Sequence, residues 1–496
     1  MKSNVSRLGL TLAVVALFGV SLSTPLVSAL DTTSAVADFI PSADYGHIDD
    51  VPYVWQEING YCYWSSVDMA LQYIDVPYNL YQFFAVSGIG FSAAYIMIED
   101  VQLFISGSSF RQQQNVPVFC DLLGLDHKAY FDSNSEWIQI AEPLWRDSGF
   151  NIELVDGSDE AFAHMQSSLD DGYPVVLWVD PYWLPAVDYA ELRQYIYPQD
   201  PAAPSSGHAI VAVGYNDTAQ TVEIMDPGVG AFGSRYGYPN DGRYYYTTNY
   251  STLDVAWNTL GYGQVVFKPG TEQAQDQELR IGKHIVDRLL GNRTSYAPEL
   301  EDIFFASFGE VAYRGLALDT TTDGIKNYLD QFNETIDRGD ILRFTGYSHE
   351  MFMSLEYPSY RSALESLPSV LPSYDVSEVV ELGRDAYPHF EEISTNASLV
   401  DLSYDFDGTL LASTYFDIAD RYDYTGNLDS ALEAYSSEIQ QLSEHFLAIA
   451  DSWKAAGELL DAILSEESTN YPLIVVFIGS ISTLFVVLVV VWRRGK

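Results

Sequence analysis

Four residues whose types suit acyl-transfer chemistry occur along the chain in the order glutamine, cysteine, histidine, aspartate. Gln56 and Cys62 lie six residues apart in WQEINGYCYW. His208 follows a glycine in GHAIVAVGYND, and Asp226 belongs to the nearby EIMDP. A thiolate is a nucleophile, an imidazole is a base, a carboxylate orients that base, and an amide stabilises an oxyanion. The order therefore predicts a cysteine acyl-transfer site.

The nucleophile must sit where its sulfur loses a proton. The segment YCYWSSVDMALQYI has the apolar spacing of a helix, with Cys62 in the first turn. A helix N-terminus lowers the pKa of a thiol, and a nearby imidazolium lowers it further. A turn at Asn59-Gly60 would bring the Gln56 amide back beside Cys62. That amide and the backbone N–H of Cys62 would then form the oxyanion hole.

The base and its carboxylate are expected on a hairpin formed by HAIVAVGY and TVEIMD. A loop centred on Asp217 makes paired residue numbers sum to 434, so that His208 faces Asp226 directly. Directly opposed residues share one face of an antiparallel pair, with Cβ atoms about 4.5–5.5 Å apart. A register slip of one residue would place the two side chains on opposite faces.

The elements around these residues predict an α+β domain over residues 45–270. Helical patterns cover residues 135–150 and 158–172, and strand-like runs cover 151–155, 174–180, 208–215, 221–226 and 263–268. Residues 271–468 show helical spacing and almost no strand signal, so we expect an all-α domain there.

The start of the chain resembles a secretory signal peptide over residues 1–29. Lys2 and Arg7 precede an apolar run, and Val27-Ser28-Ala29 supplies small residues for cleavage. An uncleaved membrane anchor is the alternative interpretation of the same pattern.

The end of the chain predicts a transmembrane helix over residues 471–492, which carry no charged residue and are long enough to cross a bilayer. Basic residues follow in the tail 493–496, which we therefore expect in the cytoplasm. A buried core helix is the alternative. The prediction is a single-pass protein of the cell membrane, with its ectodomain outside.

The acidic composition argues against nucleic acid as a partner. The 496 residues include 69 acidic and 24 basic side chains, giving a net charge of −45. Such a surface repels phosphate backbones, so nucleic-acid binding is disfavoured. No residue pattern indicates a metal site or a cofactor, and the sequence does not indicate an oligomeric state. Five sequons are compatible with glycosylation outside the cell, at Asn216, Asn249, Asn292, Asn333 and Asn396.

The two cysteines, Cys62 and Cys120, leave a further alternative open. In an oxidising compartment they could form a disulfide. Cys62 could not then act as a nucleophile, and the chain would be a non-catalytic surface binding module.

The quoted segments resemble the papain-like cysteine peptidase fold, in its bacteriocin-leader-peptidase-like branch. The continuation VPYNLYQFFAVSGIGFSAAY is more closely similar to the N-terminal domain of the butirosin biosynthesis protein H family. The resemblance covers about Val51 to Pro269, and the helical region only loosely. It implies Cys62 as nucleophile, His208 as general base and acid, Asp226 as the orienting residue. Gln56 would be the oxyanion donor.

That family suggests acyl transfer from a carrier-protein thioester, but carrier proteins are cytoplasmic. The expected signal and anchor therefore favour hydrolysis. We predict a membrane-anchored, extracytoplasmic cysteine hydrolase, a peptidase acting on a peptide or small amide substrate without a cofactor. An acyltransferase and a non-catalytic binding module are the alternatives.

Overall fold

The fold is described from a computed structural model of the 496-residue chain. It covers residues 45–56, 60–98, 101–105, 115–147, 149–184, 207–228, 246–270, 276–291, 293–295, 304–332, 337–394 and 409–476.

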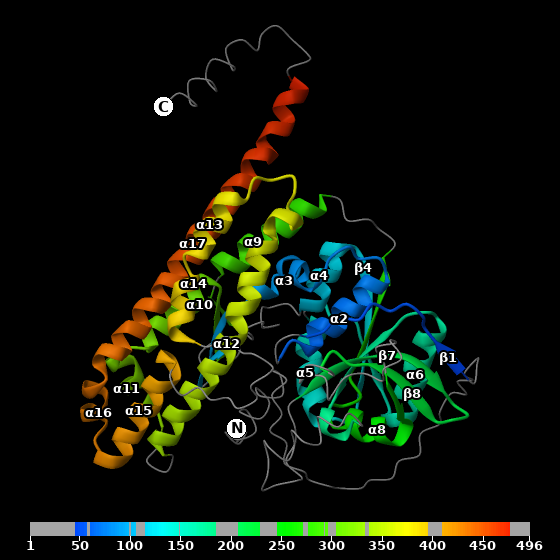
Figure 1. Ribbon diagram of the computed structural model, residues 1–496, viewed down its shortest axis with the longest axis horizontal. Helices are drawn as coiled ribbons and strands as arrows, with labels where there is room; N and C mark the ends of the chain where they lie inside the picture. The colour runs from blue at the N-terminus through cyan, green and yellow to red at the C-terminus, as the bar shows by residue number, and fades with distance from the viewer. Residues whose placement is uncertain are drawn as a thin grey trace, which may run out of the picture.

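An eight-stranded sheet organises the first half of the chain (Figure 1). Its strand order is β5-β4-β10-β6-β7-β8-β9, and β1 pairs with the far end of β7. Neighbours are antiparallel except β4 and β5, which are parallel. The strands are β1 (Tyr45–His47), β4 (Leu125–Asp132), β5 (Ile152–Val155), β6 (Val175–Val179), β7 (His208–Asn216), β8 (Thr221–Met225), β9 (Tyr246–Asn249) and β10 (Gln264–Pro269).

Helices cover both faces of this sheet. On one face, α2 (Cys62–Tyr73) packs on β7 and α4 (Asn115–Leu123) packs on β4. On the other face, α6 (Gly157–Asp170) and α8 (Tyr250–Asn258) contribute to a second apolar cluster with the strands. The mixture of elements confirms the expected α+β class. The remaining elements of this half are α3 (Leu80–Val86), η1 (Ile89–Phe91), α5 (Glu136–Asp147) and η2 (Pro181–Trp183).

The second half of the chain is mainly helical but is not all-α, which corrects the sequence-based expectation. Two strands from this half, β11 (Arg293–Ser295) and β12 (Phe304–Phe308), belong to a four-stranded sheet. In it β12 pairs with β2 (Ala94–Ile98), which pairs with β3 (Val101–Ile105). These strands are short and gain their hydrogen bonds from a distant segment, so local spacing did not reveal them.

Two long helices dominate the helical region (Figure 1). Helix α12 (Arg338–Val370) packs on α15, and α17 (Ser436–Val476) packs on α9, α10 and α13. The shorter helices are α9 (Gln277–Leu290), α10 (Glu310–Asp319), α11 (Thr322–Asp330), α13 (Ser377–Arg384), α14 (Tyr387–Ile393), α15 (Leu410–Thr425) and α16 (Leu428–Ala434).

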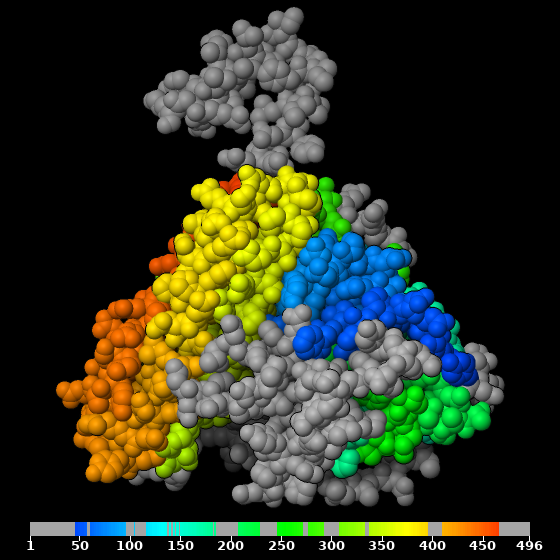
Figure 2. All heavy atoms as spheres, in the orientation of Figure 1, coloured from blue at the N-terminus to red at the C-terminus, as the bar shows by residue number. Residues whose placement is uncertain are grey.

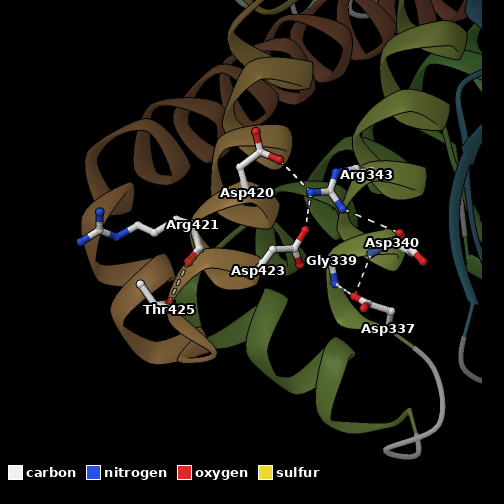
Figure 3. Close-up of polar contacts among 8 residues, drawn as sticks. All are labelled: Asp337, Gly339, Asp340, Arg343, Asp420, Arg421, Asp423 and Thr425. Atoms are coloured by element: carbon white, nitrogen blue, oxygen red, sulfur yellow. Dashed lines mark hydrogen bonds and ion pairs between the residues drawn. The ribbon is translucent and has the colours of Figure 1, made fainter.

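Exposed ion pairs add to the apolar contact between α12 and α15 (Figure 3). Arg343 of α12 lies 2.7 Å from Asp420 and 2.5 Å from Asp423, both on α15. Asp337 caps α12 by accepting hydrogen bonds from the backbone N–H groups of Gly339 and Asp340. Because these charges are solvated, packing rather than ion pairing holds the two helices together.

The two halves share one hydrophobic core. A single cluster of buried residues runs from α2 and α3 through α10 and α12 to α17. Helix α3 packs on α12, and η1 does so closely enough that a Cβ at Gly90 would lie 2.3 Å from the Ala363 Cβ. In Figure 2 the blue surface of the first helices abuts the yellow surface of the helical region. The helical region is therefore part of the same packed body.

The predicted transmembrane helix is contradicted. Among the described residues, none of the helices combines the length and the apolar character that crossing a bilayer requires. The longest, α17, carries charged residues such as Asp451 and Lys454 along its length and buries one face in the core. The described part of the expected span ends at Val476, and residues 477–492 lie outside the described residues. The single-pass anchor and the cell-membrane localisation are accordingly corrected.

Several other predictions fall outside the described residues. These are the signal peptide at 1–29, the tail at 493–496 and the sequons at Asn292, Asn333 and Asn396. Of the remaining two sequons, the Asn216 side chain accepts a hydrogen bond from the Ala219 N–H, and that of Asn249 caps α8. These contacts give both side chains a structural role, and glycosylation gains no support.

Candidate active site

Cys62 lies in the first turn of α2, as the sequence predicts, where it is the first helical residue and is partly exposed. Both cysteines have free thiols, so the structure holds no Cys62–Cys120 disulfide. Cys120 is buried in α4, and burial raises the pKa of its thiol well above the usual value. Only Cys62 is therefore suited to react as a thiolate near neutral pH.

The surroundings of Cys62 favour its thiolate. Burial by itself raises the pKa of the Cys62 thiol, since desolvation disfavours the charged form. The charge and hydrogen bond of His208, together with hydrogen bonds from the backbones of Ala209 and Tyr63, outweigh that effect. The net result is a pKa of the Cys62 thiol below its usual value. The position of the sulfur at a helix N-terminus also favours the thiolate.

His208 begins β7 and is almost entirely buried. A hydrogen bond from the Ser66 hydroxyl to the Ala209 carbonyl, 3.0 Å long, ties α2 to the start of β7 one turn after Cys62. Burial lowers the pKa of His208, but the charge of Asp226 and the contact with Cys62 raise it above the usual value overall. Cys62 and His208 therefore favour a thiolate–imidazolium pair.

Asp226 follows β8 and is completely buried. Its Oδ1 lies 2.8 Å from the Nε2 of His208 and accepts a second hydrogen bond from the backbone N–H of Gly228 at 2.9 Å. Its Oδ2 accepts from the Tyr246 hydroxyl at 3.0 Å. Because Asp226 contacts the Nε2 of His208, the Nδ1 of His208 is the nitrogen available to Cys62.

The predicted hairpin exists, but its register differs from the prediction. Asn216 pairs with Thr221 across a longer loop than expected, so paired numbers near the loop sum to 437 rather than 434. Continued unchanged, that odd sum would put His208 and Asp226 on opposite faces. A β-bulge between Ala212 and Gly214 changes the sum to 436.

The bulge restores the alignment of the base and its carboxylate. In the 436 register, Asp226 falls opposite Ile210, two residues from His208 and on the same face. Diagonal neighbours of this kind are about 7–8 Å apart at the backbone, within reach of a long side chain. The 2.8 Å contact between His208 and Asp226 spans this diagonal.

Gln56 is buried close to the same loop. Its backbone N–H donates to the carbonyl of Pro227, the residue after Asp226, at 3.2 Å. The hydroxyl of Tyr53, three residues earlier, donates to the Asp226 carbonyl at 3.2 Å. The segment before the nucleophile is thus held against the loop that carries the carboxylate. The role of the Gln56 amide as oxyanion donor stays a prediction.

Sequence reasoning missed two contributors to this site, Tyr246 and Tyr53. Burial, with the charge of Asp226, raises the pKa of Tyr246 well above the usual value, so its hydroxyl remains a donor. Tyr246 lies in β9, the strand next to β8. Its segment YTTN has the composition of a strand, but nothing in it indicates a carboxylate partner.

A match to a protein family supports a cysteine-peptidase fold for the first half of the chain. Residues 48–265 match the family model described as the Peptidase_C39 like family. The match supports a papain-like cysteine peptidase fold for this region and a cysteine-peptidase type of function. The helical region lies beyond the matched residues.

The crystal structure of a predicted C39-like peptidase from Bacillus anthracis is similar, with 13% sequence identity and a TM-score of 0.27. The similarity covers 46% of this chain and 99% of that one. No curated protein matches the chain. The resemblance to butirosin biosynthesis protein H and the acyltransferase alternative gain no support from these comparisons.

Proposed function

We propose that this protein is a cysteine hydrolase that cleaves a peptide or small amide bond, with Cys62 as nucleophile. The observation that carries the proposal is the chain of contacts from the partly exposed Cys62 through His208 to the buried Asp226. A buried carboxylate fixes the tautomer of the imidazole and stabilises its protonated form, which in turn stabilises the thiolate.

The reaction follows from this arrangement. The Cys62 thiolate attacks the carbonyl carbon of the substrate, and the carbonyl oxygen becomes an oxyanion. The backbone N–H of Cys62 and the side-chain amide of Gln56 donate hydrogen bonds to it. The imidazolium of His208 gives its proton to the leaving amine, and the C–N bond breaks.

Deacylation completes the cycle. His208, now neutral, removes a proton from water, and the resulting hydroxide attacks the thioester carbonyl. The acid product leaves, and Cys62 returns as a thiolate beside the protonated imidazole. Each step uses groups of this protein and water.

Alkylation of Cys62 by iodoacetamide tests the proposal without knowledge of the substrate. The wild-type thiol should react rapidly well below the ordinary cysteine pKa, because His208 stabilises its thiolate. In His208→Ala the acid limb of the rate–pH profile should move to higher pH, since burial then acts on the thiol without a compensating charge. Cys62→Ala should abolish labelling and Cys120→Ala should not change it.

Hydrolysis itself is measured with a peptide-amide library. The Cys62→Ala and His208→Ala variants should lose activity by roughly a thousand-fold or more. Equal alkylation rates for wild type and His208→Ala across the pH range would remove His208 from the proposed role.

A further inference from the structure

The residues just before Cys62 rest on helix α12 of the helical region. The Tyr61 hydroxyl donates a hydrogen bond of 3.0 Å to the backbone carbonyl of Leu355. Tyr61 is 6% exposed, and its ring meets that of Phe84 edge-on with centroids 5.0 Å apart. Tyr61 is thus enclosed between α3 and α12.

Gly60 makes a second contact with the same residue of α12. Its φ is +98°, a conformation that favours glycine. A Cβ at this position would lie 3.0 Å from the Cδ2 of Leu355. Two successive residues of the turn therefore contact Leu355: Tyr61 contacts its backbone carbonyl, and Gly60 lies against its side chain.

A proline lies close to the Leu355 carbonyl. Pro358 lies inside α12. Proline in a helix interior has no N–H to donate to the carbonyl four residues earlier, here that of Ser354, and it crowds the preceding turn. Leu355 lies in that preceding turn, and its carbonyl also accepts a hydrogen bond from the Ser359 hydroxyl at 3.1 Å.

The start of α2 lacks the usual capping arrangement. A helix is normally capped by Ser, Thr, Asp or Asn, whose side chain takes up a backbone N–H of the first turn. Here the N-cap residue is Tyr61, which makes no side-chain capping bond. The first-turn N–H groups therefore remain available, and the backbone of Tyr63 donates to the Cys62 sulfur.

We propose that α12 fixes the start of α2 in place of a side-chain cap, and that Tyr61 is a positioning residue for Cys62. The contact with Leu355 fixes the turn before the nucleophile while leaving the first-turn N–H groups free to face the sulfur and the oxyanion. The helical region is then a working part of the catalytic site. This inference rests on the proposed function, because Cys62 is the group that Tyr61 positions.

Tyr61→Phe removes the hydroxyl and keeps the ring against Phe84. The rate of Cys62 alkylation at mildly acidic pH should fall roughly 5- to 10-fold, as expected for the loss of one buried hydrogen bond. The acid limb of the alkylation profile should move to higher pH. With a peptide-amide substrate, kcat should fall while KM stays nearly constant. Leu355→Ala, which removes the contact with Gly60, should act in the same direction.

Tyr360→Phe is the matched control. The Tyr360 hydroxyl, also buried in the helical region, donates to the backbone carbonyl of Gly383 at 2.8 Å, away from the α2 turn. This variant should lose comparable stability and keep the wild-type alkylation profile.

Two outcomes would overturn the inference: a Tyr61→Phe profile identical to wild type, or equal losses in Tyr61→Phe and Tyr360→Phe. Failure of the proposed function is recognised separately, because it appears as wild-type alkylation in His208→Ala, whatever Tyr61→Phe does.

Discussion

At the scale of single residues, the buried Asp226 carboxylate is the least solvated charge in the candidate site. It is fully buried and accepts hydrogen bonds from His208, Gly228 and Tyr246. A buried carboxylate that loses a donor is destabilised as an anion. Tyr246 therefore supports the charge that holds His208 in place.

Tyr246→Phe should lower kcat/KM roughly 10-fold or more, since a hydrogen bond to a charged group contributes about 1.5–3 kcal/mol. The reason is that the Asp226 carboxylate loses a donor that holds it in position, so that the orientation of the His208 imidazole is less well fixed. Steady-state kinetics and the alkylation profile of Cys62 measure the effect.

The comparison is Tyr250→Phe. The Tyr250 hydroxyl donates to the Asp217 carboxylate at 2.7 Å, in the hairpin loop and away from the reacting groups. Kinetics unchanged from wild type in both variants would show that Asp226 does not need its tyrosine.

Much of this site could be predicted from residue types, because only a few types of side chain can act as nucleophile, base or orienting carboxylate. The order of Gln56, Cys62, His208 and Asp226 was readable, and the structure brings the last three together. Tyr246 was not readable, because its contact with Asp226 depends on β9 pairing with β8 after a long intervening segment.

At the scale of elements, helix α2 and the β7–β8 hairpin position the reacting groups. The start of α2 was predicted to within a residue, with Cys62 in its first turn, since its apolar spacing is local. The hairpin was predicted but its register was not, because loop length and bulges depend on backbone geometry that side-chain patterns do not report. The prediction that His208 and Asp226 share a face held only because of the bulge at Val213.

Deletion of Ala212 and Val213 together should abolish activity, by roughly a hundred-fold or more, since small displacements of catalytic groups have effects of that size. Without both residues, Asp226 falls opposite Ala209, and His208 and Asp226 then lie on opposite faces. Deletion of Val213 alone removes the bulge but keeps the observed pairs, so the two side chains should still share a face.

Loss of rapid Cys62 alkylation in the double deletion, but not in the single one, is the expected result. Circular dichroism verifies that both variants are folded. A folded double deletion with wild-type activity would contradict the role given to this register.

At the scale of the whole molecule, the sequence suggested two domains of different class, and the structure joins them. One buried cluster extends from α2 to α17, and β2 of the first half pairs with β12 of the second. Such long-range contacts have no local signature, so composition and periodicity pointed to a boundary near residue 270 without showing how much of the core crosses it.

Residues 45–270 expressed alone should not fold to a monomer with a reactive Cys62. The fragment would expose the apolar face of α3 that α12 covers, and it would lose two strands of the smaller sheet. Size-exclusion chromatography and alkylation of the fragment measure this. The full chain, in contrast, should unfold in one cooperative transition. A monomeric fragment that reacts at the wild-type rate would show that the helical region is dispensable.

The bond between Tyr61 and α12 ends on a main-chain oxygen, that of Leu355. Evolution can therefore exchange one aliphatic side chain for another at position 355 without breaking it. A functional contact between two side chains usually shows in related sequences as coupled substitution of the two residues. We expect little coupled substitution for this contact. Its trace would instead be the joint persistence of a tyrosine before the nucleophile and a proline inside the supporting helix.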